Sequence, residues 1–156
     1  MCRSSPIVFH PITYRGSRGR RRTDETRSRK IVLPLITGMQ ARGPRRLLCL
    51  TGTMVGTLPS NVSLALRVMA EAYRNWCPAL AADAAEQERL EIYSHLDRTL
   101  VKPPRLTNSL PTQLIRSGPT LHVGQLSRIT RSDLATILLN EARDSHHLQE
   151  PVYVCR

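Results

Sequence analysis

Apolar residues recur at helical spacing in several stretches of the chain. In "IVLPLITGMQARG" the residues Ile31, Leu35 and Met39 lie four positions apart, and Gly43 closes the stretch. This spacing predicts a helix that begins near Ile31, since one apolar stripe would face a core. Pro34 then falls in the first turn of the helix, where a missing N–H is tolerated.

Further helices are predicted in the middle of the chain and near its end. The stretch "SNVSLALRVMAEAYRNW" indicates a helix capped by Ser60 or Asn61, and strong helix formers follow from about Ala79 to His95. In "ITRSDLATILLNEARD" the residues Thr130 and Asp133 form an N-cap box ahead of an apolar stripe. These segments account for the helical part of the predicted fold.

Short apolar runs between the helices predict β-strands. Leu47–Leu50 form one strand, the strand in "RTLVKPP" must end at its two prolines, and "PVYVC" closes the chain. The region before the last helix is loop-like, with one short strand around Thr120–Val123. Strands that alternate with helices are typical of parallel sheets with crossover connections, so the sequence predicts an α/β fold.

Positive charge is concentrated at the N-terminus. The formal net charge of the 156 residues is +11, and residues 1–30 hold nine Arg or Lys against Asp24 and Glu25. The same stretch mixes Pro, Gly and Ser without periodicity, and its charge density opposes collapse. We therefore expect residues 1–29 to be a basic, disordered extension and residues 30–156 to form the folded domain.

Composition and spacing exclude several classes of protein and site. No run approaches the roughly 18 apolar residues of a membrane span, and no secretory signal is evident, so we expect a cytoplasmic protein that does not bind membranes. The adjacent His146 and His147 cannot face the same way, and no metal site is predicted. The cysteines lie at wide intervals without a C-x-x-C pair; they are Cys2, Cys49, Cys77 and Cys155.

Two segments follow predicted strands where an open parallel sheet binds ligands. In such sheets ligands lie beyond the carboxyl ends of the strands. "LTGTM" offers the hydroxyls of Thr51 and Thr53, and Gly52 allows a flat ring to approach the backbone. In "KPPRLTN", Arg105 and Asn108 could hold a phosphate or a carboxylate. A purely structural role for both turns remains the alternative.

Glu88 is a second candidate residue. Its neighbours three and four positions away include Ala84, Ala85 and Ile92, so its side chain is expected to point inward along a largely apolar helix face. A buried carboxylate needs a partner or a chemical role. A glutamate at the rim of that face, or one that caps a neighbouring backbone, is the alternative that we favour.

From about Lys30 onward the chain resembles the C-terminal half of atypical short-chain dehydrogenase/reductase proteins that bind NAD(P), in the NmrA-like and flavin-reductase-like group. The resemblance lies in three segments in order: "LITGMQARGPRRLLCLTG", "LAADAAEQERLEIYSHLDRTLVKPPRL" and "SRITRSDLATILLNEA". It implies a partial Rossmann-like parallel sheet with flanking helices, from which the N-terminal part of the fold is missing. It further implies that the residues bordering the nicotinamide and the acceptor substrate are Thr51, Gly52, Thr53, Pro103, Pro104 and Arg105.

The chain departs from this family at the site for the dinucleotide phosphates. Family members begin with a strand and a glycine-rich loop that holds the pyrophosphate. Here Gly16 and Gly19 give only "GSRGRRR", without a preceding regular strand or a third glycine. His95 also stands where the family usually has a left-handed glycine. We therefore expect a truncated NAD(P)-binding reductase-like protein with impaired dinucleotide binding, and we name no catalytic residue.

Other classes of function remain open at this point. One is a noncatalytic interaction module that associates with itself through an exposed sheet edge. Another is nonspecific nucleic-acid binding through the Arg-rich arm, which we consider less favoured than a solvated tail. In an intact relative, hydride would pass from a reduced nicotinamide to a small or flavin-like acceptor, and the protein would supply orientation more than acid or base.

Overall fold

The computed structural model describes residues 7–11, 27–54, 56, 58, 62–112, 114–124 and 126–156. In this part of the chain the helices are α1 (Arg27–Arg42), α2 (Leu64–Trp76), α3 (Pro78–Tyr93) and α4 (Arg131–Asp144). The strands are β1 (Ile7–Pro11), β2 (Arg46–Leu50), β3 (Asp97–Lys102), β4 (Arg105–Thr107), β5 (Arg116–Gly118), β6 (Arg128–Thr130) and β7 (Pro151–Cys155).

The main sheet is parallel except at one edge. Its strand order is β1-β2-β3-β7-β5, in which the first four strands run parallel and β5 pairs with β7 in the antiparallel sense. A separate parallel pair joins β4 and β6. Because parallel strands share a direction, the carboxyl ends of β1, β2, β3 and β7 lie along one edge of the sheet. We call this edge the carboxyl edge.

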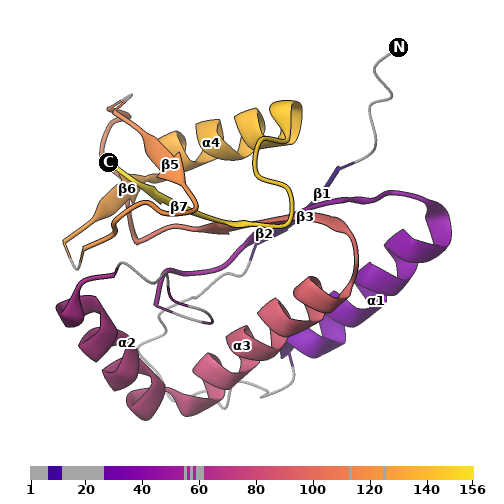
Figure 1. Cartoon of the computed structure of the whole chain (residues 1–156), viewed down its shortest axis with the longest axis horizontal. Coiled ribbons are helices and arrows are strands. Elements are labelled where there is room, and N and C mark those ends of the chain that lie inside the picture. The colour runs from indigo at the N-terminus through magenta and orange to yellow at the C-terminus, as the bar shows by residue number, and fades with distance from the viewer. Residues whose placement is uncertain are drawn as a thin grey trace.

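Helices cover both faces of the sheet. In Figure 1, α1, α2 and α3 lie on one side of the strands and α4 lies on the other. The side chains of each strand alternate between these layers, so Leu47, Cys49 and Leu100 join the core under α1, whereas Val101 joins the core under α4. A smaller cluster under α2 contains Tyr153. The fold is therefore an α/β fold of the Rossmann-like type, as the sequence predicts.

Several segments differ from their predictions. The strand β1 lies within residues 1–29, which were expected to be disordered, and helix α1 begins at Arg27 rather than at Ile31. The strand β1 was not predicted because residues 1–29 are highly charged and show no periodicity. A strand of five residues can form without such a signal when a neighbouring strand pairs with it, and here β2 does so. Pro34 consequently lies inside α1 and not in its first turn. The remaining parts of the expected disordered arm lie outside the described residues.

The start of α2 and the loop before α4 also needed correction. Ser63 caps α2 by accepting a hydrogen bond from the Leu66 amide, whereas the predicted caps Ser60 and Asn61 lie outside the described residues. The short strand is Arg116–Gly118 rather than Thr120–Val123, because its partner β7 provides pairing that local sequence cannot reveal.

The strongest local signal of the sequence is confirmed at α4. Thr130 caps this helix, because its hydroxyl accepts a hydrogen bond from the Asp133 amide at 3.0 Å.

Among the described helices, none is both long and apolar enough to cross a membrane.

Candidate functional site

Two loops meet at the carboxyl edge, between β2 and β3. The amide of Thr51 donates to the carbonyl of Val101 at 3.0 Å, and the amide of Thr53 donates to the carbonyl of Pro103 at 3.2 Å. The Thr53 hydroxyl donates to the carbonyl of Lys102 at 3.0 Å. The structure therefore brings together the predicted segments Thr51–Thr53 and Pro103, and backbone hydrogen bonds fix their relative position.

Thr51 stands apart from Thr53 in its hydrogen bonding. Its side chain is buried, and within the described part of the chain its Oγ1 atom has no hydrogen-bond partner. A buried hydroxyl without a partner costs about 1–3 kcal/mol, so such groups are rare in folded proteins. Gly52 beside it is only half-buried. The turn thus combines an unused polar atom with accessible backbone.

Glu88 points inward, as predicted, and pairs with a cation that sequence reasoning missed. Lys102 Nζ donates to both carboxylate oxygens of Glu88, at 3.0 and 2.9 Å, and both side chains are buried. Burial lowers the pKa of Lys102, although the adjacent Glu88 carboxylate acts in the opposite direction. The pair joins α3 to the end of β3, directly before the prolines of the candidate site. The expectation that Glu88 lies at the rim of its face or caps a backbone is therefore wrong.

The surroundings of Glu88 are tight on one side and open on the other. A Cβ atom placed on Gly56 would lie 1.6 Å from Glu88 Oε2, so only glycine fits at this position. Tyr153 of β7 is buried nearby, and burial raises the pKa of its phenol to about 12, with Glu88 adding to the shift. A cavity of about 360 Å³ opens beside Glu88, between α2 and α3, and its walls include Met54 and Arg74.

The other predicted residues lie farther along the chain in a separate element. Arg105 opens β4 and is exposed, and Pro104 before it is half-buried. Asn108 is exposed and accepts a hydrogen bond from Arg131 at the start of α4. Among the described contacts, none joins Arg105 or Asn108 to Thr51 or Thr53. The structure thus joins Pro103 to the turn and leaves these two polar residues outside it.

A second buried charged cluster lies at the opposite edge of the sheet. Glu141 of α4 accepts a hydrogen bond from Arg46 Nη2 at 2.9 Å and from Thr99 Oγ1 at 3.2 Å. His147 contributes its amide and its ring, with Nδ1 at 2.9 Å from Glu141 Oε2. Burial alone would raise the pKa of Glu141, but the hydrogen bonds and charge of His147 hold it below its usual value. This cluster attaches α4 to the sheet.

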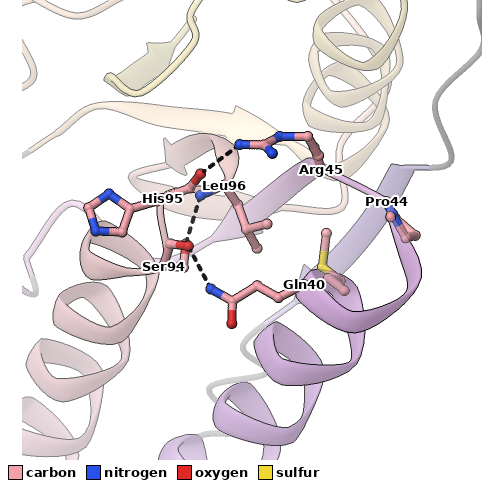
Figure 2. Close-up of a pocket in the computed structure, with 8 residues that line it drawn as sticks. Gln40, Pro44, Arg45, Ser94, His95 and Leu96 are labelled. Carbon is pink, nitrogen blue, oxygen red and sulfur yellow. Dashed lines mark hydrogen bonds between the residues drawn. The ribbon is translucent and has the colours of Figure 1, made fainter.

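A cavity of about 350 Å³ lies at the same edge, between the C-terminal ends of α1 and α3. Figure 2 shows that Gln40 and Arg45 reach across it. Gln40 Nε2 donates to the carbonyl of Ser94 at 2.9 Å, and Arg45 Nη2 donates to the carbonyl of His95 at 3.4 Å. These donors satisfy carbonyls at the end of α3, so the arrangement is accounted for by helix termination.

The comparisons with known proteins agree with this architecture. A family model described as NAD(P)H-binding matches residues 7–145, so the resemblance begins at β1 and not near Lys30. This range includes the turn at Thr51–Thr53 and the Glu88–Lys102 pair. No curated protein matches the sequence significantly.

Solved structures share the fold at low sequence identity. A short-chain dehydrogenase/reductase from Veillonella parvula DSM 2008 in complex with NADP aligns with a TM-score of 0.67 and 10% identity, over 96% of this chain and 62% of that one. The anaerobillin reductase ChuY from Escherichia coli O157:H7 aligns with a TM-score of 0.61 and 15% identity, over 78% of this chain and 54% of that one.

A third likeness is to the oxidoreductase ylbE from Lactococcus lactis, with a TM-score of 0.57 and 17% identity, over 80% of this chain and 52% of that one. This chain therefore spans between about half and two-thirds of the length of these relatives. The family model covers most of the chain and the fold agrees with it, so this protein belongs to the NAD(P)H-binding family.

Proposed function

We propose that this chain binds the nicotinamide end of NAD(P)H over the turn Thr51–Thr53 and orients it toward a small or flavin-like acceptor. The observation that carries the proposal is the buried Thr51 hydroxyl, which has no hydrogen-bond partner within the described part of the chain. A carboxamide on the ligand would supply the missing partner. When bound, the reduced cofactor supplies the hydride, and the chain contributes position and a fixed backbone.

The surrounding structure supports Thr51–Thr53 as a rigid platform. Hydrogen bonds from Thr53 to Lys102 and Pro103 hold the turn against β3, and the buried Glu88–Lys102 pair holds the end of β3 against α3. Groups that are held in this way lose little freedom on binding, which favours a defined ligand orientation. Pro104 and Arg105 follow directly and would border the acceptor side of the site.

We further propose that the dinucleotide binds more weakly than in the longer relatives. The strand β1 precedes Gly16 and Gly19, so the expected lack of a strand before these glycines was wrong. The sequence between β1 and α1 still holds two glycines, whereas the dinucleotide fingerprint has three. Residues 12–26 lie outside the described residues. Weaker phosphate contacts would leave the nicotinamide end with most of the binding energy.

Titrations with NADPH and NADH, followed by nicotinamide fluorescence, test both parts of this proposal. We expect saturable binding with a Kd above the micromolar range. Thr51→Val should weaken binding by about 2- to 10-fold, which corresponds to one lost hydrogen bond. The same variant should be at least as stable as the natural chain, because an unpaired buried hydroxyl is removed.

Thr136→Val is the matched control. Thr136 lies on α4, where its exposed hydroxyl donates to the carbonyl of Ser132. A micromolar Kd would contradict weak binding but not the site. No saturable binding would contradict the cofactor, and equal affinities for the Thr51 and Thr136 variants would contradict the role of Thr51.

A further inference from the structure

Helix α2 carries more apolar surface than the fold covers. Its buried residues are Leu66 and Ala70, whereas Leu64 is 76% exposed, Val68 60% and Trp76 88%. Met69 is also exposed, at 41%. Figure 1 places α2 at the periphery of the molecule. We call the exposed side the α2 apolar face, and its members are Leu64, Ala65, Val68, Met69, Ala72 and Trp76.

The α2 apolar face carries no charge, and the exposed Asn75 is the one uncharged polar residue at its margin. At 100° per residue, Leu64, Val68, Ala72 and Trp76 form one i, i+4 row, and Ala65 and Met69 lie in the row beside it. The charged residues Arg67, Glu71 and Arg74 border the Leu64 side of the face, and Arg74 and Glu71 form an ion pair with each other. A partner for this face is therefore apolar. A lipid surface is less suited, because basic side chains do not flank the face on both sides.

The area of the face is in the range of a modest protein interface. Its four large side chains present on the order of 500 Å² of apolar surface, as large as the largest patches on ordinary monomers. A standard interface buries about 800 Å² on each partner. Two such faces together would bury on the order of 1,000 Å², the lower limit for a specific interface, so one helix pairing suits a weak, reversible dimer.

The pattern along α2 is self-complementary when two copies run antiparallel. An interface with twofold symmetry brings each residue against its counterpart in reverse order. Centred near residue 70, this order sets Val68 against the partner's Ala72 and Leu64 against the partner's Trp76. A large side chain thus meets a small one in the middle, and apolar side chains meet at both ends. No like charges are brought together.

We propose that two copies of this chain associate through an antiparallel contact between their α2 apolar faces. The occupant is a second copy because the face is uncharged, self-complementary and of adequate area. This surface is distinct from the sheet edge at which the sequence alone suggested self-association. None of its members lines the cavity beside Glu88, and the proposal does not depend on cofactor binding.

Sedimentation equilibrium of the full chain, over a wide concentration range, tests the proposal. We expect the mass to rise from 17.6 kDa toward twice that value as the concentration increases. Val68→Glu would set buried charges near the twofold axis and should leave a monomer at all concentrations. Leu139→Glu is the matched control, because Leu139 of α4 is 65% exposed and apolar; it should associate like the natural chain.

Trp76 is the single tryptophan of the chain, so its fluorescence reports on this face directly. Its emission should shift to shorter wavelength as the mass rises, and the shift should be absent in Val68→Glu. A natural chain that stays monomeric, or a Val68→Glu variant that still associates, would overturn the proposal. A shift that occurs only on vesicles of anionic phospholipid, with no rise in mass, would overturn it in favour of lipid binding. Circular dichroism confirms that each variant is folded.

Discussion

Replacing Lys102 by methionine should destabilise the fold strongly. Lys102 Nζ lies 3.0 and 2.9 Å from the Glu88 oxygens, and the two side chains are 0% and 5% exposed. Methionine fills much of the lysine stem but leaves the Glu88 carboxylate buried without its cation. Removal of one partner of a buried ion pair costs about 3–5 kcal/mol, so we expect the free energy of unfolding to fall by that amount.

The double variant Glu88→Gln/Lys102→Met separates charge from packing. Both charges are removed while the side-chain volumes are largely kept, so its stability should return to within about 1 kcal/mol of the natural chain. A double-mutant cycle then gives the coupling energy of the pair.

Urea denaturation followed by circular dichroism measures these differences, provided that the m-values agree. Arg89→Met is the matched control, because Arg89 pairs with Glu86 on the exposed side of α3 and its loss should change little. If Lys102→Met were as stable as this control, the buried pair would not stabilise the fold. If the double variant were as unstable as Lys102→Met, the loss would come from packing and not from the unpaired Glu88 charge.

For three further substitutions the structure predicts whether the free energy of unfolding rises or falls. Burial raises the pKa of Glu91 to about 7, so the free energy of unfolding falls as the pH rises from 4.5 through 7. Glu91→Gln stays uncharged and should therefore be more stable than the natural chain by up to about 3 kcal/mol above pH 7, measured by urea denaturation across pH. Glu141 has the opposite sign, because its pKa is lowered: Glu141→Gln, which weakens the bonds from Arg46 and His147, should cost about 2–4 kcal/mol at neutral pH and less in acid. His95 has φ +55, so His95→Gly should raise stability by about 1 kcal/mol in thermal unfolding, whereas His95→Ala should not.

Local signals predicted the elements that local sequence determines. The strand Asp97–Lys102 ends before its two prolines, and α4 begins at Thr130 with the predicted capping bond. The left-handed conformation of His95 agrees with the glycine that the family resemblance implies at this position. β1 and β5 were missed or misplaced because their stability comes from neighbouring strands far away in sequence. The hydrophobic periodicity of a short segment does not predict pairing of this kind.

The candidate site was predictable in outline but not in its polar interior. The rule that ligands lie beyond strand ends identified Thr51–Thr53, and the spacing on α3 identified Glu88 as inward-facing. Lys102 was missed because a lysine next to prolines suggests an exposed loop. The alternation of β3 held the signal, since Lys102 is two residues after the buried Leu100 and so faces the same layer as Glu88. Among the described residues, the lack of a hydrogen-bond partner for Thr51 Oγ1 depends on atomic positions that no sequence pattern encodes.

Under the proposed function, the buried polar residues near the carboxyl edge would orient the cofactor rather than act as acids or bases. Lys102 is bound to Glu88, and Tyr153 is 1% exposed with a phenol pKa of about 12, so neither is suited to pass a proton to an acceptor near neutral pH. Tyr153→Phe should therefore leave kcat for NADPH oxidation with a flavin acceptor unchanged within about 2-fold, whereas loss of a general acid typically costs 10²–10⁴-fold. The NADPH Kd of the variant, measured in parallel, separates a binding defect from a chemical one. A hundredfold loss of kcat at unchanged Kd would contradict this reasoning. It would mean that the Tyr153 phenol, buried in the structure, becomes exposed and contacts the acceptor during the reaction.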